Sequence, residues 1–123
     1  MAVPDTYKIG MGGEDAAAEW LRGNGFELLH RNWRNGRYEI DIVARRGDRI
    51  HFVEVKTRRA GGLTTPEDAI DRRKVASLTR AASLYLSLYD VSLEPQFDLV
   101  AVDRYPDGSV TVRYVPDAME FRW

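Results

Sequence analysis

The spacing of hydrophobic and polar residues along the chain predicts two helices and five strands. In the first helix, expected over residues 12–23, apolar side chains recur with Glu14 at helical spacing. The second and longer helix is expected to begin at Pro66, since proline favours a first helical turn, and to end near Tyr89. Runs of alternating or β-branched residues predict strands over residues 26–33, 38–45, 49–57, 96–104 and 109–115.

The order of these elements, α-β-β-β-α-β-β, predicts an α/β fold in which a mixed sheet of about five strands is flanked by two main helices. A chain of 123 residues has the length of one domain, so residues 1–123 are expected to form a single domain. The absence of cysteine excludes disulfides and thiol catalysis. Neither a membrane-spanning apolar stretch nor an N-terminal signal is recognisable, and a cytoplasmic location is expected.

The net charge of −1 conceals an uneven distribution. Residues 20–60 carry ten arginines and lysines against five acids, whereas residues 90–123 carry an excess of four acids. This asymmetry indicates a basic face, although a folded chain can also interleave such segments. Fifteen of the 18 basic residues are arginine, whose planar guanidinium suits phosphate, but a compositional bias of the source genome explains this equally well.

The strands over residues 38–45 and 49–57 are expected to form a hairpin closed by the two-residue loop Gly47-Asp48. Facing residues then have numbers that sum to 95, which places Asp41 opposite Glu54 on one face of the sheet. The same rule places Glu39 opposite Lys56 on this face, and Tyr38, Ile40 and Ile42 on the other.

Two carboxylates that face each other across a ladder repel each other, and Asp41 and Glu54 therefore require a positive group between them. That group is a proton, the Lys56 ammonium or a divalent cation. Oxygen ligands suit Mg²⁺ or Mn²⁺. The alternative is a solvated charge network on an exposed sheet face, but Val43 and Phe52 on the same face make it partly buried and favour a functional site.

Two further residues belong to this candidate site. Glu14 lies on the apolar stripe of its helix, where it serves either as a metal or water ligand or as a first-turn acid that favours the helix dipole. Lys74 lies within the apolar arc of the long helix and is expected either to pair with Asp71 or to reach a phosphate. The arc consists of Ile70, Leu78, Ala81, Ala82, Tyr85 and Leu88.

Other polar residues are interpreted as structural. His30 and His51 have no carboxylate partner at catalytic spacing, and His51 is expected to point away from the site. Asp98 is expected to cap an element or to pair with an arginine. The glycines at positions 10, 12 and 13 follow no strand and precede no Lys-Ser/Thr pair, so no nucleotide cofactor is expected.

The arrangement of Asp41, Glu54 and Lys56 resembles the signature of the PD-(D/E)XK restriction-endonuclease-like superfamily. The wider sequence resembles the YraN-like bacterial family, which is itself similar to archaeal Holliday junction resolvases. The resemblance covers about residues 9–102. It rests on the runs GGEDAAAEWLRGNGFELLHRNWR (12–34), YEIDIVAR (38–45), FVEVKTR (52–58) and FDLVAV (97–102), with a lysine, Lys74, in the following helix.

The resemblance implies a restriction-endonuclease-like fold and a Mg²⁺- or Mn²⁺-dependent endonuclease that hydrolyses DNA phosphodiester bonds, on branched or single-stranded DNA in repair or recombination. It implies that Asp41 and Glu54 are metal ligands, helped by the backbone carbonyl of Val55 and by Glu14. Lys56 would orient or activate the attacking water and stabilise the developing negative charge.

Under the same resemblance, four basic residues are candidates for contacts with the DNA backbone: Arg34, Arg58, Arg59 and Lys74. Analogy with the resolvases adds the expectation of a homodimer. Two alternatives remain open: a non-catalytic nucleic-acid-binding or adaptor domain that retains the fold, which the near-neutral charge favours, and a protein-interaction module that uses Trp20, Trp33 and Trp123.

Overall fold

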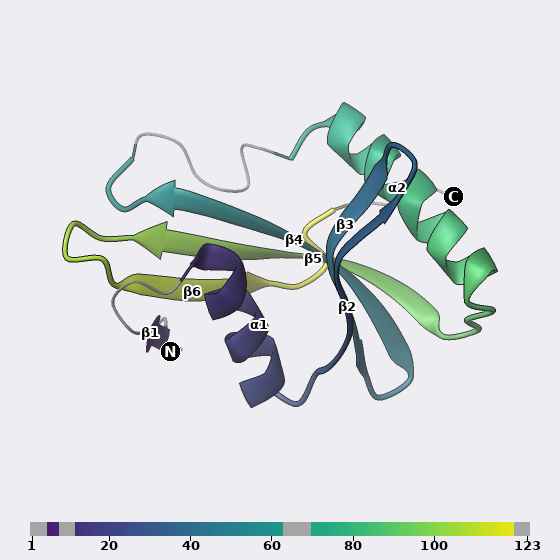
Figure 1. Cartoon of the computed structure of the whole chain (residues 1–123), viewed down its shortest axis with the longest axis horizontal. Coiled ribbons are helices and arrows are strands. Elements are labelled where there is room, and N and C mark those ends of the chain that lie inside the picture. The colour runs from purple at the N-terminus through teal and green to yellow at the C-terminus, as the bar shows by residue number, and fades with distance from the viewer. Residues whose placement is uncertain (1–4, 8–11, 63–69, 120–123) are drawn as a thin grey trace.

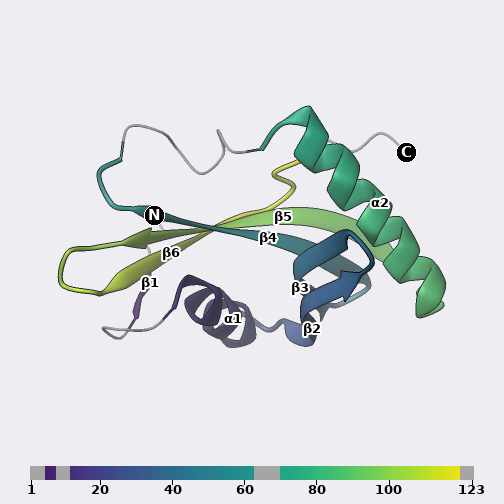
Figure 2. The same cartoon turned by 45° about the horizontal axis from the view of Figure 1, so that its top comes forward.

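The computed structural model describes residues 5–7, 12–62 and 70–119, which form an α/β fold with a helix on each side of a mixed sheet (Figures 1 and 2). Five of the strands and both helices follow the order predicted from the sequence. The elements are β1 (Asp5–Tyr7), α1 (Gly13–Gly23), β2 (Glu27–Asn35), β3 (Tyr38–Arg46), β4 (Arg49–Arg59), α2 (Arg72–Leu88), β5 (Glu94–Arg104) and β6 (Val110–Val115).

The strands lie in the order β1-β6-β5-β4-β3-β2. β4 and β5 are parallel and remain in register over eleven residue pairs, from Arg49 with Glu94 to Arg59 with Arg104. The other neighbouring strands are antiparallel. The predicted fold class is therefore confirmed, and the short strand β1, which the sequence pattern did not predict, adds a sixth strand at one edge through its pairing with β6.

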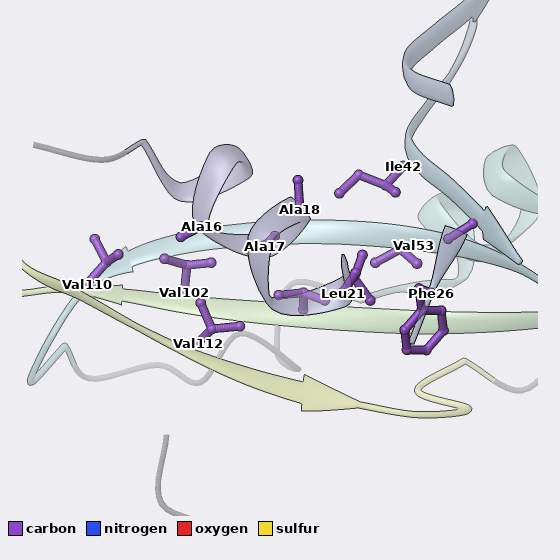
Figure 3. Packing of buried hydrophobic residues seen from close by; sticks show 12 residues of the cluster. Ala16, Ala17, Ala18, Leu21, Phe26, Ile42, Val53, Val102, Val110 and Val112 are labelled. Carbon is purple, nitrogen blue, oxygen red and sulfur yellow. The ribbon is translucent and has the colours of Figure 1, made fainter. Parts of the chain in front are cut away.

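Each helix covers its own hydrophobic core on one face of the sheet (Figure 2). The core under α1 is built from small helix residues against valines of the sheet (Figure 3): Ala16, Ala17, Ala18, Leu21, Phe26, Ile42, Ala44, Val53, Val100, Val102, Val110 and Val112. The core under α2 is richer in aromatic residues: Trp33, Ile40, Val43, Ile50, Phe52, Leu78, Ala81, Ala82, Tyr85, Phe97 and Met119.

The beginning of α1 lies directly against β4. A Cβ atom added to Gly13 would lie 2.0 Å from Oγ1 of Thr57. No real pair of atoms adopts such a separation, so only glycine permits this approach of helix to strand. Thr57 therefore faces α1, and Gly13 fixes the height at which the helix begins, close to the Glu54–Lys56 segment of the same strand.

We expect Gly13→Ala to lower the free energy of unfolding by about 1–3 kcal/mol, because the added methyl group overlaps Thr57 and must displace helix or strand. Urea denaturation measures the change. Gly23→Ala in the same helix is the matched control, since nothing lies within 4 Å of its added Cβ, and it should be neutral or stabilising. Gly13→Ala/Thr57→Ala should recover part of the loss; a Gly13→Ala protein as stable as wild type would contradict the packing described.

The long helix begins later than the sequence pattern predicted. The predicted start, Pro66, lies outside the described residues, and α2 begins at Arg72. Asp71 is its N-cap, and the Asp71 carboxylate accepts a hydrogen bond from the backbone N–H of Lys74 (2.8 Å). The predicted apolar arc is buried at Leu78, Ala81, Ala82 and Tyr85, but Leu88 is 54% exposed.

Two of the three tryptophans considered for an interaction surface belong to the packed interior. Trp33 is buried in the core under α2, and Trp20 stacks on Tyr114 with ring centroids 5.0 Å apart. Trp123 lies outside the described residues. In the described part of the chain, no helix combines the length and the apolar character needed to cross a membrane.

Candidate functional site

The hairpin of β3 and β4 has the predicted register over its first part. Pairs from Arg46 with Arg49 to Ile42 with Val53 all sum to 95, and the two-residue loop contains Gly47 at φ 62°. The ladder ends at Ile42, one residue before Asp41. Asp41 and Glu54 therefore lie where β3 leaves β4 rather than within a continuous ladder.

The alternation of side chains breaks at this point of β3. Ile40 and Tyr38 pack in the core under α2 together with Val43, whereas strict alternation would place them on the other face. Opposite the break, Asn32 of β2 has a left-handed backbone conformation, φ 51°. The predicted placement of Tyr38 and Ile40 is thus wrong, because an irregularity in the β2–β3 pair turns both strands.

Asp41 bridges the gap that opens between the strands. Its Oδ2 atom accepts a hydrogen bond from the backbone N–H of Val55 at 2.8 Å, which replaces the missing ladder bond. In a β-strand the N–H and C=O of one residue point to the same side. The carbonyl of Val55 is therefore directed towards the same gap as the carboxylate of Asp41.

Glu54 is the buried member of the site, with a side chain only 8% exposed. Its Oε1 atom lies 3.2 Å from Nζ of Lys74 on α2 and 3.7 Å from Nζ of Lys56. Lys74 thus reaches the site, while Asp71 contacts only its backbone. The predicted contact of Lys56 with Glu39 is not formed, because Glu39 lies beyond the end of the ladder and pairs instead with Arg34 (3.2 Å).

The electrostatics of the site are unfavourable for a charged Glu54. Burial raises the pKa of Glu54, and repulsion by Asp41 raises it further; the attraction of Lys74 and Lys56 offsets only part of both effects. Positive charge added near Asp41 and Glu54 would therefore be bound favourably.

Glu14 lies at the edge of this region and is held by β2. Its Oε1 atom accepts a hydrogen bond from Asn32 Nδ2 (2.8 Å) and lies 3.4 Å from Nη2 of Arg31, which also binds Asp15 (2.7 Å). Asn32 stands opposite Asp41 in the β2–β3 pair, between the printed partners on either side. Over residues 5–7, 12–62 and 70–119, no three histidine or acidic side chains gather closely enough to hold a metal ion.

The donors that do meet are of the kind a hard divalent cation prefers. Asp41, Glu54 and the Val55 carbonyl supply oxygen atoms only, and Mg²⁺ commonly retains several waters beside one or two carboxylates. The residues present therefore fit Mg²⁺ or Mn²⁺ with a small number of protein ligands. Glu14 could approach such an ion only through a change in its contacts with Arg31 and Asn32.

The four basic residues considered for DNA contacts do not share one surface. Lys74 is in contact with Glu54, and Arg58 lies on the same face of β4 as Lys56 by alternation. Arg59 is on the opposite face of β4. Arg34 is exposed on β2, where it pairs with Glu39.

A second polar cluster lies on the α1 face of the sheet and was not foreseen from the sequence. Asp98 is fully buried and accepts hydrogen bonds from His51 Nδ1 and Tyr114 Oη (both 2.7 Å), and from Gln96 Nε2 and the Asp117 N–H (both 3.0 Å). His51 does point away from Glu54, as expected, but the expectation that it lacks a carboxylate partner is wrong. Asp98 is structural, with His51 rather than an arginine as its partner.

Comparison with known proteins gives one family. Residues 13–102 match the family described as uncharacterised protein family UPF0102. A UPF0102 protein of Nitratidesulfovibrio vulgaris is 43% identical over 115 residues, covering 93% of this chain and 85% of that protein. A UPF0102 protein of Symbiobacterium thermophilum is 41% identical over 112 residues (90% and 95%), and one of Bacteroides thetaiotaomicron is 39% identical over 95 residues (77% and 78%).

Proposed function

Because the chain belongs to the uncharacterised protein family UPF0102, whose description names no activity, we propose its function from the chemistry of the Asp41–Glu54–Lys56 site. The protein is a Mg²⁺- or Mn²⁺-dependent endonuclease that hydrolyses DNA phosphodiester bonds, and it belongs to the PD-(D/E)XK superfamily. The observation that carries this proposal is the buried Glu54 carboxylate beside Asp41, with the amine of Lys56 at 3.7 Å.

The two carboxylates hold the cation in this proposal. Asp41 is positioned by its hydrogen bond to Val55, and the protein ligands are Asp41, Glu54 and the Val55 carbonyl. The cation supplies a water of lowered pKa and a positive charge for the phosphoryl oxygen. Glu54 must be ionised to bind it, so binding strengthens as the pH rises through the raised pKa of Glu54.

The amines supply the remaining chemistry. Lys56 lies beside the carboxylate pair, is one-third exposed and reaches the solvent side of the site, where it orients the attacking water and stabilises negative charge on the phosphate. Lys74 approaches Glu54 from α2 and keeps part of the carboxylate charge compensated before the cation arrives. Arg58 contacts the DNA backbone on the same face as Lys56.

A cleavage assay tests the proposal. Wild-type protein should cut at least one substrate in a panel of single-stranded, duplex and branched DNA, only with Mg²⁺ or Mn²⁺, and Asp41→Asn should lower the rate at least about 100-fold. Asparagine retains an acceptor for the Val55 N–H while removing the charge. Glu39→Gln, two positions away on the same strand, is the matched control and should cut as wild type does.

The result that contradicts the endonuclease is equally specific. Wild type that shows no cation-dependent cleavage on any substrate, and no Mg²⁺ binding by calorimetry, would remove it.

A second candidate, a nucleic-acid-binding domain without catalysis, is favoured by one observation. Lys74 and Lys56 already place two ammonium groups near Glu54, so the buried carboxylate is compensated without a metal ion. In that case wild type and Asp41→Asn would bind DNA equally well and neither would cut it.

A further inference from the structure

A hollow lined by arginines lies at the ends of the two parallel strands, away from Glu54. Its volume is about 540 Å³, within the range of small-ligand sites. It is lined by Thr57, Arg58, Arg59, Arg104, Tyr105 and Pro106. Figures 1 and 2 show that this end of β4 and β5 projects past both helices.

Two of its arginines are direct neighbours. Arg59 and Arg104 are partners in the parallel ladder, and like charges in such positions repel each other. Within the described ranges, neither side chain has a carboxylate within 4.0 Å. The acid nearest in sequence beyond the ladder, Asp107, accepts hydrogen bonds from the N–H and hydroxyl of Ser109 instead. The pair therefore concentrates positive charge that the described chain leaves uncompensated.

These arginines face the α1 side of the sheet. Thr57 touches Gly13 of α1, and Arg59 follows it by two residues on the same strand face. Val102 belongs to the core under α1, and Arg104 follows it in the same way. Lys56 and Glu54 face the other side, towards Lys74 of α2.

We propose that this hollow binds a phosphate and the adjacent base of an unpaired nucleic-acid strand. Arg59 and Arg104 present paired guanidinium groups, the geometry best suited to a phosphate. Tyr105, 39% exposed beside them, offers an aromatic face on which a base of any identity can stack.

The position of the hollow selects the class of substrate, an inference that rests on the proposed function. A strand held at both Arg59 and Lys56 must pass from one face of the sheet to the other around the free ends of β4 and β5. Along the strand these residues are only about 10 Å apart, at roughly 3.3 Å per residue. Duplex DNA, with a persistence length of about 150 base pairs, does not bend around such an edge, whereas a single strand does. The preferred substrate therefore carries an unpaired segment.

The test compares Arg59→Ala/Arg104→Ala with wild type by fluorescence anisotropy. The probes are a labelled twenty-nucleotide oligo-dT and a labelled duplex of the same length, without divalent cations so that no cleavage occurs. We expect the Kd for oligo-dT to rise about tenfold or more, and the slope of log K against log salt to fall by about 1.4, or 0.7 for each phosphate lost. The Kd for duplex should rise much less.

A charge-matched double variant is the control. Arg45→Ala/Arg49→Ala removes the same charge from exposed positions at the other end of the β3–β4 pair, and should change the oligo-dT affinity far less. Tyr105→Ala should weaken oligo-dT binding about fivefold or more and Tyr105→Phe should not, because stacking needs only the ring.

The outcomes separate this inference from the endonuclease itself. Equal losses in the two arginine variants, an equal loss on duplex, or no oligo-dT binding by wild type would overturn the inference. A wild type that cuts DNA while Arg59→Ala/Arg104→Ala retains full single-strand affinity would refute the hollow and leave the endonuclease standing. Arginine-dependent binding without any cation-dependent cleavage would support the hollow and remove the endonuclease.

Discussion

Lys56→Met is expected to lower the rate of Mg²⁺-dependent DNA cleavage by about 100-fold or more at saturating Mg²⁺ and DNA. A positioned proton-transfer or charge-stabilising group contributes roughly 10²–10⁴-fold. Methionine keeps the length of the side chain and removes its charge. Because Lys56 is not a metal ligand in our proposal, calorimetry should find Mg²⁺ affinity retained.

Lys74→Met is the informative companion variant. Lys74 lies closer to Glu54 than Lys56 does, 3.2 Å against 3.7 Å, and its attraction opposes the rise in the pKa of Glu54 caused by burial and by Asp41. Its removal should raise that pKa further, so the variant should need a higher pH or more Mg²⁺ to reach its maximal rate. Unchanged cleavage by Lys56→Met would refute the role assigned to that amine.

The second large effect is expected at the buried cluster on the α1 face. Asp98→Ala should lower the free energy of unfolding by about 3–5 kcal/mol, the usual result of removing one partner from a buried charged network. The substitution leaves His51, Tyr114 and Gln96 without their acceptor in a fully buried position. Urea denaturation at pH 7 measures the loss, and a change below about 1 kcal/mol would contradict it.

The same residue makes stability depend on acid. Burial alone would raise the pKa of Asp98, but the hydrogen bonds from His51, Tyr114, Asp117 and Gln96 outweigh it, and the pKa lies below its ordinary value of 3.8. A lowered folded-state pKa means that the stabilisation is present above about pH 4 and is lost as the pH falls towards the folded-state value. Asp98→Asn, which is uncharged, should show a smaller loss of stability between pH 7 and pH 3 than wild type does.

The elements that local sequence determines were predictable. The loop Gly47-Asp48 fixes the register of β3 with β4, and with it the proximity of Asp41 and Glu54. The alanine stripe of α1 identified the face that packs on the sheet. In each case residues close in sequence decide the outcome, through a turn that only certain residues permit or through a regular period.

The features that the sequence did not disclose depend on distant partners. The break at Asp41 is matched by the left-handed Asn32 on the neighbouring strand, and a strict period of two cannot foresee such a paired irregularity. The His51–Asp98 contact forms across the parallel pair β4–β5, whose register no short turn specifies. The lysine pair at Glu54 was anticipated only in part, because the reach of Lys74 depends on how α2 packs.

The parallel pairing of β4 and β5 also bears on how the protein folds. Its paired residues lie 45 positions apart along the chain, and α2 forms part of the intervening connection. Closing so long a loop costs entropy before any contact repays it, so this step is expected to be slow relative to formation of the β3–β4 hairpin. Glu54 would then acquire its burial late, and during synthesis the carboxylate pair would stay hydrated until the ribosome has released β5.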